Sequence, residues 1–324
     1  MMKILFITSS YKGIYDYFEE WIVSELRKNH EVEFFHFKDG LSNLQLLTRK
    51  FNPEVALTLV GFKLPIQMVH WLKKQEVKTA VWFTEDPYFM DRTQLLSKYF
   101  DYVFTIDSAA LEYYKNNGHL HAYQLPLAAE PHVFKPKVVE TKYKSDICLV
   151  GFPYPDRVQF IQFLLQNTVY NIKVVGNWSN RLFRFRSNPK LMIHEGWVPP
   201  TVVADFYNGA KIVLNTLRPF NLKQNQNKLG IVGKSINNRT FDAAACGSFQ
   251  LIQYKEDLQH YFIENEEIVS FKNNQELCQK IDYFLKSEVE RQRIADNARK
   301  RVLREHTFEK RLEKMLELIK DSTK

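Results

Sequence analysis

The chain has 324 residues, about twice the length of a typical domain, which predicts two domains. Its composition is 45% hydrophobic and 25% charged with only 11 Gly and 12 Pro, which excludes a disordered, collagen-like or low-complexity protein. The formal charge of +8 is uneven: residues 1–140 hold 16 basic and 17 acidic side chains, and residues 142–241 hold 14 and 4. Such an excess is typical of proteins that bind nucleic acid, anionic membranes or phosphorylated ligands.

The first 140 residues alternate between strand and helix patterns. An apolar run at residues 3–8 predicts a buried strand, and a helical pattern then leads to a second strand at residues 32–37. Further strands are expected at residues 55–60, 79–83, 102–106 and 122–125, with helices at 65–74 and 109–117. This alternation predicts a doubly wound α/β domain with a parallel sheet.

Three prolines (Pro126, Pro131 and Pro136) then mark a linker, after which the alternation resumes. Strands are expected at residues 146–150, 172–175, 191–194, 212–215, 247–253 and 268–271, with helices at 157–166, 201–208, 239–245 and 274–285. The charged segment 288–320 predicts two helices broken near residues 306–307. The second half is therefore expected to be another α/β domain.

Several classes of protein are excluded. Cys148, Cys246 and Cys278 are widely spaced and lack CxxC spacing, which is typical of buried thiols in a reducing compartment. No apolar run reaches 18 residues and the first residues do not resemble a signal peptide, so we expect a cytoplasmic protein. No GxGxxG or Walker sequence supports a nicotinamide enzyme or a P-loop ATPase, and no metal-ligand spacing is present.

Ligands of parallel sheets bind beyond the carboxyl ends of the strands, which selects three segments of the second half. Gly151 follows a strand and either lets a phosphate approach the backbone or belongs to an ordinary turn. The polar segment Asn221–Lys234 is either a mobile loop or a functional lid. Arg239 and Asp242 share a helix face, where they either bind a phosphate and a ribose or pair with each other.

In the first half, Glu85 and Asp86 end a predicted strand and precede Pro87. Adjacent carboxylates at such a place are candidates for general-base catalysis. The alternative is that Pro87 simply holds Asp86 in an extended conformation.

An ordered set of motifs carries a resemblance to a known family. The chain resembles the CgeB/YkvP-like spore-maturation glycosyltransferases, which have the GT-B architecture. The matching segments, in chain order, are WFTEDP at 82–87, LPLAAEP at 125–131, VG at 150–151 with Arg157, EGWVP at 195–199, NTLR at 215–218, NRTFDAAACGSF at 238–249, and Arg291 to Phe308.

The resemblance implies two Rossmann-like domains facing a cleft, with crossing helices at the carboxyl end. Residues 1–140 would present the acceptor, residues 141–305 would bind a nucleotide-sugar (a UDP-sugar), and helix 306–324 would pack back on the first domain. No metal or other cofactor would be required. The donor site would comprise Gly151, Trp197, Val198, Arg218, Lys228, Asn238, Arg239, Asp242, Gly247, Ser248 and Phe249.

Catalysis would rest on Arg239, which would stabilise the departing diphosphate, and on Asp86 as the base of an inverting reaction. Two departures leave the stereochemistry open. Asp242 stands where the family usually has Glu, and Lys234 stands where related retaining enzymes carry a second Glu. The acceptor is not identified: a glycan, a cell-surface or spore polymer, a protein and a nucleic acid all remain candidates.

Another class of function stays open. The run Arg181–Arg186 interleaves basic and aromatic residues, as a nucleic-acid-binding surface does. The chain would then be a nucleic-acid-binding protein, or a glycosyltransferase acting on nucleic acid or another polyanion. A GT-B relic that binds without catalysis is the third alternative.

Overall fold

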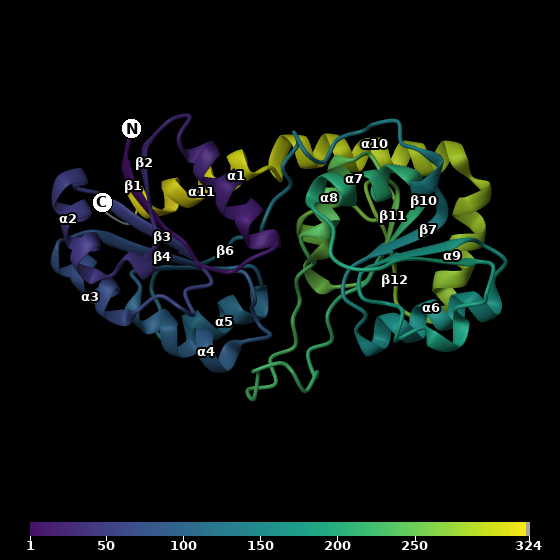
Figure 1. Ribbon diagram of the computed structural model, residues 1–324, viewed down its shortest axis with the longest axis horizontal. Coiled ribbons are helices and arrows are strands. Elements are labelled where there is room, and N and C mark those ends of the chain that lie inside the picture. Colours follow the sequence, from purple (N-terminus) through teal and green to yellow (C-terminus); the bar gives the residue numbers. More distant parts are fainter. Residues whose placement is uncertain (322–324) are drawn as a thin grey trace. The chain divides into compact units, whose positions relative to one another are not determined.

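The computed structural model describes residues 1–321 and divides the chain into two compact units. Unit 1 comprises residues 1–127, 220–235 and the segment from Phe308 onward, and unit 2 comprises residues 128–219 and 236–307. The chain therefore passes between the units four times (Figure 1).

Unit 1 is built from six strands and six α-helices. These are β1 (Lys3–Ile7), α1 (Ile14–Leu26), β2 (Glu31–Phe35), α2 (Leu41–Phe51), β3 (Val55–Leu59), α3 (Ile66–Lys74), β4 (Lys78–Phe83), α4 (Met90–Leu96), β5 (Tyr102–Thr105), α5 (Ser108–Asn116), β6 (Ala122–Gln124) and α11 (Phe308–Asp321). Its strands form one parallel sheet in the order β2-β1-β3-β4-β5-β6.

Unit 2 is built in the same way. Its elements are β7 (Ser145–Val150), α6 (Pro155–Asn167), β8 (Ile172–Val175), β9 (Leu191–His194), α7 (Pro200–Gly209), β10 (Ala210–Asn215), α8 (Arg239–Ala245), β11 (Gln250–Gln253), β12 (Val269–Phe271), α9 (Asn274–Lys286) and α10 (Glu288–Glu305). The strands form a parallel sheet in the order β12-β11-β10-β7-β8-β9. The two sheets confirm the predicted α/β class.

Two helices of unit 1, α2 and α4, have no counterpart among the predicted elements. Helix α4 has seven residues, fewer than two full turns, so its sequence is too short to show a helical period. In α2 only Leu44 and Thr48 are fully buried, which leaves the apolar stripe incomplete. By contrast, the predicted break in the C-terminal segment is confirmed, because α10 ends at Glu305 and α11 begins at Phe308.

Helix α11 is part of unit 1, although it follows all of unit 2 in sequence. Figure 1 shows α1 and α11 on one face of the unit 1 sheet, with α3, α4 and α5 on the other. Phe308 lies with its ring centre 6.1 Å from that of Phe18 and 5.8 Å from that of Trp21. The buried Arg311 donates a hydrogen bond to the carbonyl of Pro126. Aromatic packing holds α11 against α1, and the hydrogen bond joins α11 to the segment that follows β6.

The segment Phe220–Ser235, which we call the strap, also belongs to unit 1. Its polar sequence predicts a mobile loop or a lid of the second domain. Instead, Asp91 donates its N–H to the carbonyl of Gln226 and accepts from the N–H of Lys228, both at 2.8 Å. The strap is thus hydrogen-bonded to unit 1.

The carboxylate of Asp107 is the main anchor of the strap. Asp107 is 2% exposed and accepts from the N–H groups of Ala109 and Ala110, so it caps α5. The same side chain accepts from the N–H groups of Lys234 and Ser235, each at 2.9 Å. One buried carboxylate therefore serves a helix start and the strap.

We predict that Asp107→Ala lowers the free energy of unfolding by about 3 kcal/mol, because it leaves buried N–H groups of the helix and the strap without an acceptor. Urea denaturation measures this change. Asp39→Ala is the matched control, since Asp39 is an exposed carboxylate of unit 1. Equal stability of the two variants would contradict the anchoring role.

Candidate functional site

In the parallel sheet of unit 2, β8 and β9 extend the sheet to one side of β7, and β10, β11 and β12 extend it to the other. Counted from its own first strand, the sheet has the order 3-2-1-4-5-6, so the connections after β7 and after β10 run to opposite sides. Ligands of such sheets bind where the two loops separate. Gly151 follows β7 directly and Thr216 follows β10 directly, which places both at this switch point.

Two arginines converge on Gly151. A Cβ atom on this residue would lie 2.9 Å from Nη1 of Arg157 and 3.1 Å from Nη1 of Arg239, and Gly151 has a φ of +141°. Only glycine meets both conditions. The carbonyl of Thr216 accepts from both guanidinium groups, at 2.8 Å from Arg157 and 3.3 Å from Arg239.

The arginines differ in how they are held. Arg157 is 2% exposed and also donates to Oγ1 of Thr216 and to the carbonyl of Phe152. It therefore fixes the loops after β7 and β10. Arg239 and Arg218 are partly exposed, and the guanidinium of Arg218 lies 5.7 Å from the ring centre of Tyr154, which Arg157 also contacts at 4.9 Å. A bound anion would therefore meet Arg218 and Arg239.

Beside the arginines lie three polar atoms that have no hydrogen-bond partner among the described residues. Asn238 donates to Oδ2 of Asp242 at 2.9 Å, but Oδ1 of Asn238, Oδ1 of Asp242 and the hydroxyl of Tyr207 are buried and unpaired. Burial raises the pKa of Asp242 well above its usual range, while Arg239 and Asn238 oppose this shift. Unpaired buried acceptors destabilise a fold, and they are suited to receive hydroxyl donors from a ligand.

The structure does not bring Gly247, Ser248 and Phe249 into this cluster. They lie after the end of α8 and directly before β11, at the edge of the sheet where the strands begin. The switch point lies at the opposite edge, where the strands end. The hydroxyl of Ser248 donates to the carbonyl of Tyr207, and the Phe249 ring packs against Phe284 at 4.5 Å. These contacts are structural, and we therefore leave the three residues out of the donor site.

The remaining expected donor residues are Trp197, Val198 and Lys228. Trp197 and Val198 follow β9 at the edge of the sheet; Trp197 is 61% exposed and Val198 packs beside Phe206. Lys228 belongs to the strap of unit 1, where its N–H is bonded to Asp91. Lys234, which stands where related retaining enzymes carry a second Glu, is in the strap too, and its side chain pairs with Glu112 at 3.8 Å.

Asp86 is enclosed by hydroxyl groups of unit 1. It is 1% exposed and accepts from Thr93 at 2.7 Å and from Thr105 and Tyr114 at 2.8 Å. With both oxygens engaged and no exposed surface, this carboxylate is poorly placed to take a proton from a substrate, so the geometry does not favour the expected role as a base.

No pattern in the sequence assigns a role in the site to Tyr154, Thr216 or Tyr207. Thr216 belongs to the NTLR motif at 215–218, in which only Arg218 is an expected donor residue, and Tyr154 lies in the segment that stands out for Gly151. Their importance comes from contacts with arginines that are distant in the chain, and a single sequence does not show such pairs.

No cluster of three or more His, Cys, Asp or Glu side chains suited to a metal is found within residues 1–321. None of the helices described there is long and apolar enough to cross a membrane.

Comparisons with known proteins agree with this architecture. Residues 157–317 match a family model described as "Glycosyl transferase-like". The chain is 33% identical over 310 residues to the spore protein CgeB of Bacillus subtilis (strain 168), covering 95% of this chain and 96% of that protein.

Solved structures show the same fold. Sucrose-phosphate synthase (tll1590) from Thermosynechococcus elongatus has a TM-score of 0.72 at 12% identity, covering 100% of this chain and 99% of that one. Anabaena Alr3699/HepE in complex with UDP and glucose has a TM-score of 0.70 at 11% identity, covering 99% and 100%. Both units thus follow the GT-B arrangement of two Rossmann-like sheets with C-terminal helices.

The buried Asp86 predicts a pH dependence of stability. Burial raises its pKa from 3.8 to about 7, a charge on Asp107 adds to the increase, and the three hydroxyl donors oppose it. The folded protein therefore keeps a proton that the unfolded chain releases near pH 4, so this group's contribution to stability falls as the pH rises from 4 through 7.

We expect Asp86→Asn to remove this dependence. We compare the free energy of unfolding of the variant with that of the unmodified chain by urea denaturation at pH 5 and at pH 8. The difference between them should shift in favour of the variant by roughly 2 kcal/mol from the lower to the higher pH. Asp39→Asn, at an exposed site, serves as the control. If the free energy of unfolding changes with pH in the same way for the unmodified chain and for Asp86→Asn, the pKa of Asp86 is not raised and the prediction is wrong.

Proposed function

Because this chain belongs to the CgeB-like family of glycosyltransferases, we propose that it transfers a sugar from a UDP-sugar held by unit 2 to an acceptor presented by unit 1. The observation that carries the proposal is the convergence of Arg157 and Arg239 on Gly151 and Thr216 at the switch point. A diphosphate is the ligand whose charge offsets the repulsion between such closely placed cations.

Each residue of the cluster has a separate task in this proposal. Arg218 and Arg239 bind the diphosphate, and Gly151 allows it to approach the backbone. The unpaired oxygens of Asn238 and Asp242 accept hydrogen bonds from the ribose hydroxyls. Trp197 and Val198 flank the base. Uracil and UDP are supported by the UDP that accompanies Alr3699/HepE, which shares the fold.

The reaction follows from this charge distribution. The acceptor oxygen forms a bond to the anomeric carbon while the bond from that carbon to the β-phosphate oxygen breaks, and the electron pair leaves with the diphosphate. The acceptor proton passes to water or a basic group. Arg218 and Arg239 stabilise the negative charge that develops on the leaving oxygen, which is a task that requires no metal ion.

One observation supports the second candidate function, nucleic-acid binding. Arg181, Arg184 and Arg186 are exposed around Phe183, which is 66% exposed and lies 5.6 Å from the guanidinium of Arg186. This surface is in unit 2 but outside the arginine cluster, so the two functions are tested by different variants.

We predict that Arg239→Ala weakens UDP binding between ten- and a hundredfold, about 1.4–2.8 kcal/mol, because it removes a partly exposed cation from the diphosphate site. Titration calorimetry measures the affinity. Arg184→Ala is the matched control, since it removes the same charge from the exposed surface around Phe183.

Equal UDP affinity of the two variants would refute the site. If the chain instead binds nucleic acid, it should bind a single-stranded DNA oligonucleotide with an affinity that falls as the salt concentration rises. Arg184→Ala should then weaken DNA binding, and the unmodified chain should not bind UDP.

A further inference from the structure

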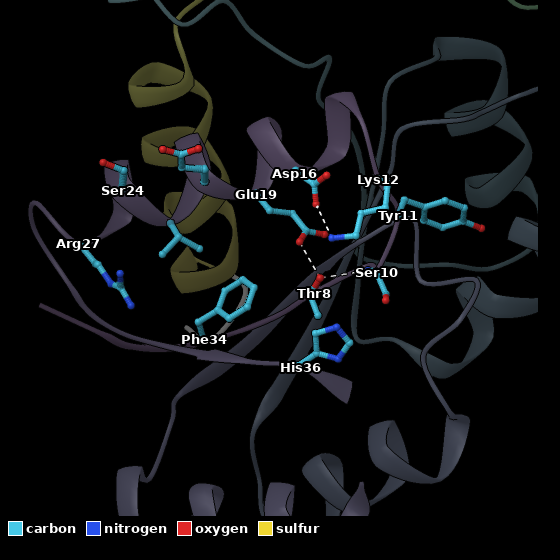
Figure 2. Close-up of a pocket in the computed structure, with 12 residues that line it drawn as sticks. Thr8, Ser10, Tyr11, Lys12, Asp16, Glu19, Ser24, Arg27, Phe34 and His36 are labelled. Atoms are coloured by element: carbon cyan, nitrogen blue, oxygen red, sulfur yellow. Dashed lines mark hydrogen bonds and ion pairs between the residues drawn. The ribbon is translucent and has the colours of Figure 1, made fainter. Parts of the chain in front are cut away.

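Unit 1 contains a groove of about 510 Å³ between α1 and the edge strand β2. Figure 2 shows side chains of α1 on one wall, with Phe34 and His36 on the wall that faces them. Its inner end lies at the loop that follows β1. Its lining includes Thr8, Asp16, Glu20, Ser24, Arg27 and Phe34.

The groove departs from the packing expected of a parallel sheet. Such sheets are normally covered on both faces by apolar helix surfaces. Strands β1, β3 and β4 of unit 1 are almost fully buried, but of the five residues of β2 only Phe35 is buried. Helix α1 carries Glu20 and Ser24 along the groove, Arg27 follows at its C-terminal end, and Phe34 stays 44% exposed. Departures of this kind are expected at functional sites.

The inner end of the groove is held rigidly. Glu19 is 5% exposed and accepts from the hydroxyls of Thr8 and Ser9 at 2.6 Å and from the N–H of Ser9 at 2.7 Å. The N–H of Ser10 donates to the hydroxyl of Thr8. Asp16 pairs with Lys12 at 3.2 Å. These bonds fix the loop before any ligand arrives.

The outer part of the groove offers polar groups that are not used within the protein. The side chains of Glu20 and Ser24 are exposed and make no hydrogen bond or ion pair with any of residues 1–321. Nδ1 of His36 accepts from the N–H of Lys38, so the neutral ring carries its proton on Nε2 and is a donor there. A ligand thus finds a carboxylate, a hydroxyl, an imidazole N–H and one face of an aromatic ring.

The charges of the lining decide between the acceptor classes. Lys12 and Arg27 are opposed by three carboxylates, those of Asp16, Glu19 and Glu20. A site for a polyanion would carry an excess of cations. Carboxylates suit the hydroxyls of an uncharged ligand, and the exposed phenyl ring suits its C–H groups.

We propose that this groove binds the acceptor, and that the acceptor is a neutral, polyhydroxylated chain, namely a saccharide without phosphate or carboxylate groups. Phe34 supports a sugar ring by stacking, while Glu20, Ser24 and Arg27 hydrogen-bond to its hydroxyls. The inference rests on the proposed transfer reaction, because it names the acceptor class of that reaction.

The test uses ligand-observed NMR on the full chain with UDP present. The neutral probes are hexasaccharides of glucose and of N-acetylglucosamine in different linkages, and the polyanionic probes are a heparin fragment and a single-stranded DNA oligonucleotide. We expect at least one neutral probe to bind with an affinity that does not change between 50 and about 300 mM salt, because no counterions are released.

Phe34→Ala and Glu20→Gln should each weaken this binding about tenfold, since one removes the stacking surface and the other a charged acceptor. Leu46→Ala, which removes a 64% exposed apolar side chain of α2 in the same unit, is the control and should change nothing. All three variants should bind UDP like the unmodified chain, because the arginine cluster lies in unit 2.

The inference is overturned if no neutral probe binds, if only the polyanions bind, or if Phe34→Ala and Leu46→Ala give the same saccharide affinity. In each of these cases retained UDP binding leaves the donor proposal intact. If the unmodified chain does not bind UDP, the donor proposal is refuted instead. The two failures are therefore distinguishable.

Discussion

The hydrogen bonds from Arg157 and Arg239 to the carbonyl of Thr216 are the interaction on which the proposed donor site of unit 2 depends. Two guanidinium groups repel each other at such a short range, and the fold must hold them there. It does so by burying Arg157 with further bonds to Thr216 and Phe152, and by leaving Gly151 without a side chain. The remaining repulsion is what a diphosphate would relieve.

The places where the chain departs from ordinary packing coincide with the places where we propose ligands. In unit 2 the buried oxygens of Asn238 and Asp242 lack donors. In unit 1 an aromatic ring of β2 remains exposed beside polar residues of α1. Both features cost stability, and a chain selected only for stability would replace them by apolar groups. Binding of the proposed donor and acceptor would give each feature a function.

The strap links unit 1 to the proposed donor site of unit 2 through the chain itself. It begins directly after Arg218 and Pro219 and ends three residues before Asn238, so residues of the proposed donor site flank it on both sides. Its body is bonded to Asp91 and Asp107 of unit 1.

Local patterns determined most of the fold. Runs of β-prone residues such as Ile172–Val175 and Leu191–His194 form strands with the predicted bounds, and α8 begins at Arg239 and ends at Ala245 as expected. These elements depend on side-chain period and on nearby capping or turn residues, all of which are visible in a single sequence. The family resemblance, which rests on ordered motifs, also indicates Arg218, Arg239 and Asp242 as candidate site residues.

Only the tertiary structure decided how these residues are used. Asp86 carries the same carboxyl group whether it is exposed or enclosed by Thr93, Thr105 and Tyr114, and that enclosure makes it a buried structural group. The strap has the sequence of a polar loop of the second half, yet its bonds are with unit 1. Sequence by itself determined most of the elements, α2 and α4 excepted, and the chemical groups that they carry. Burial and long-range pairing decided their roles, because these arise from residues far apart in the chain.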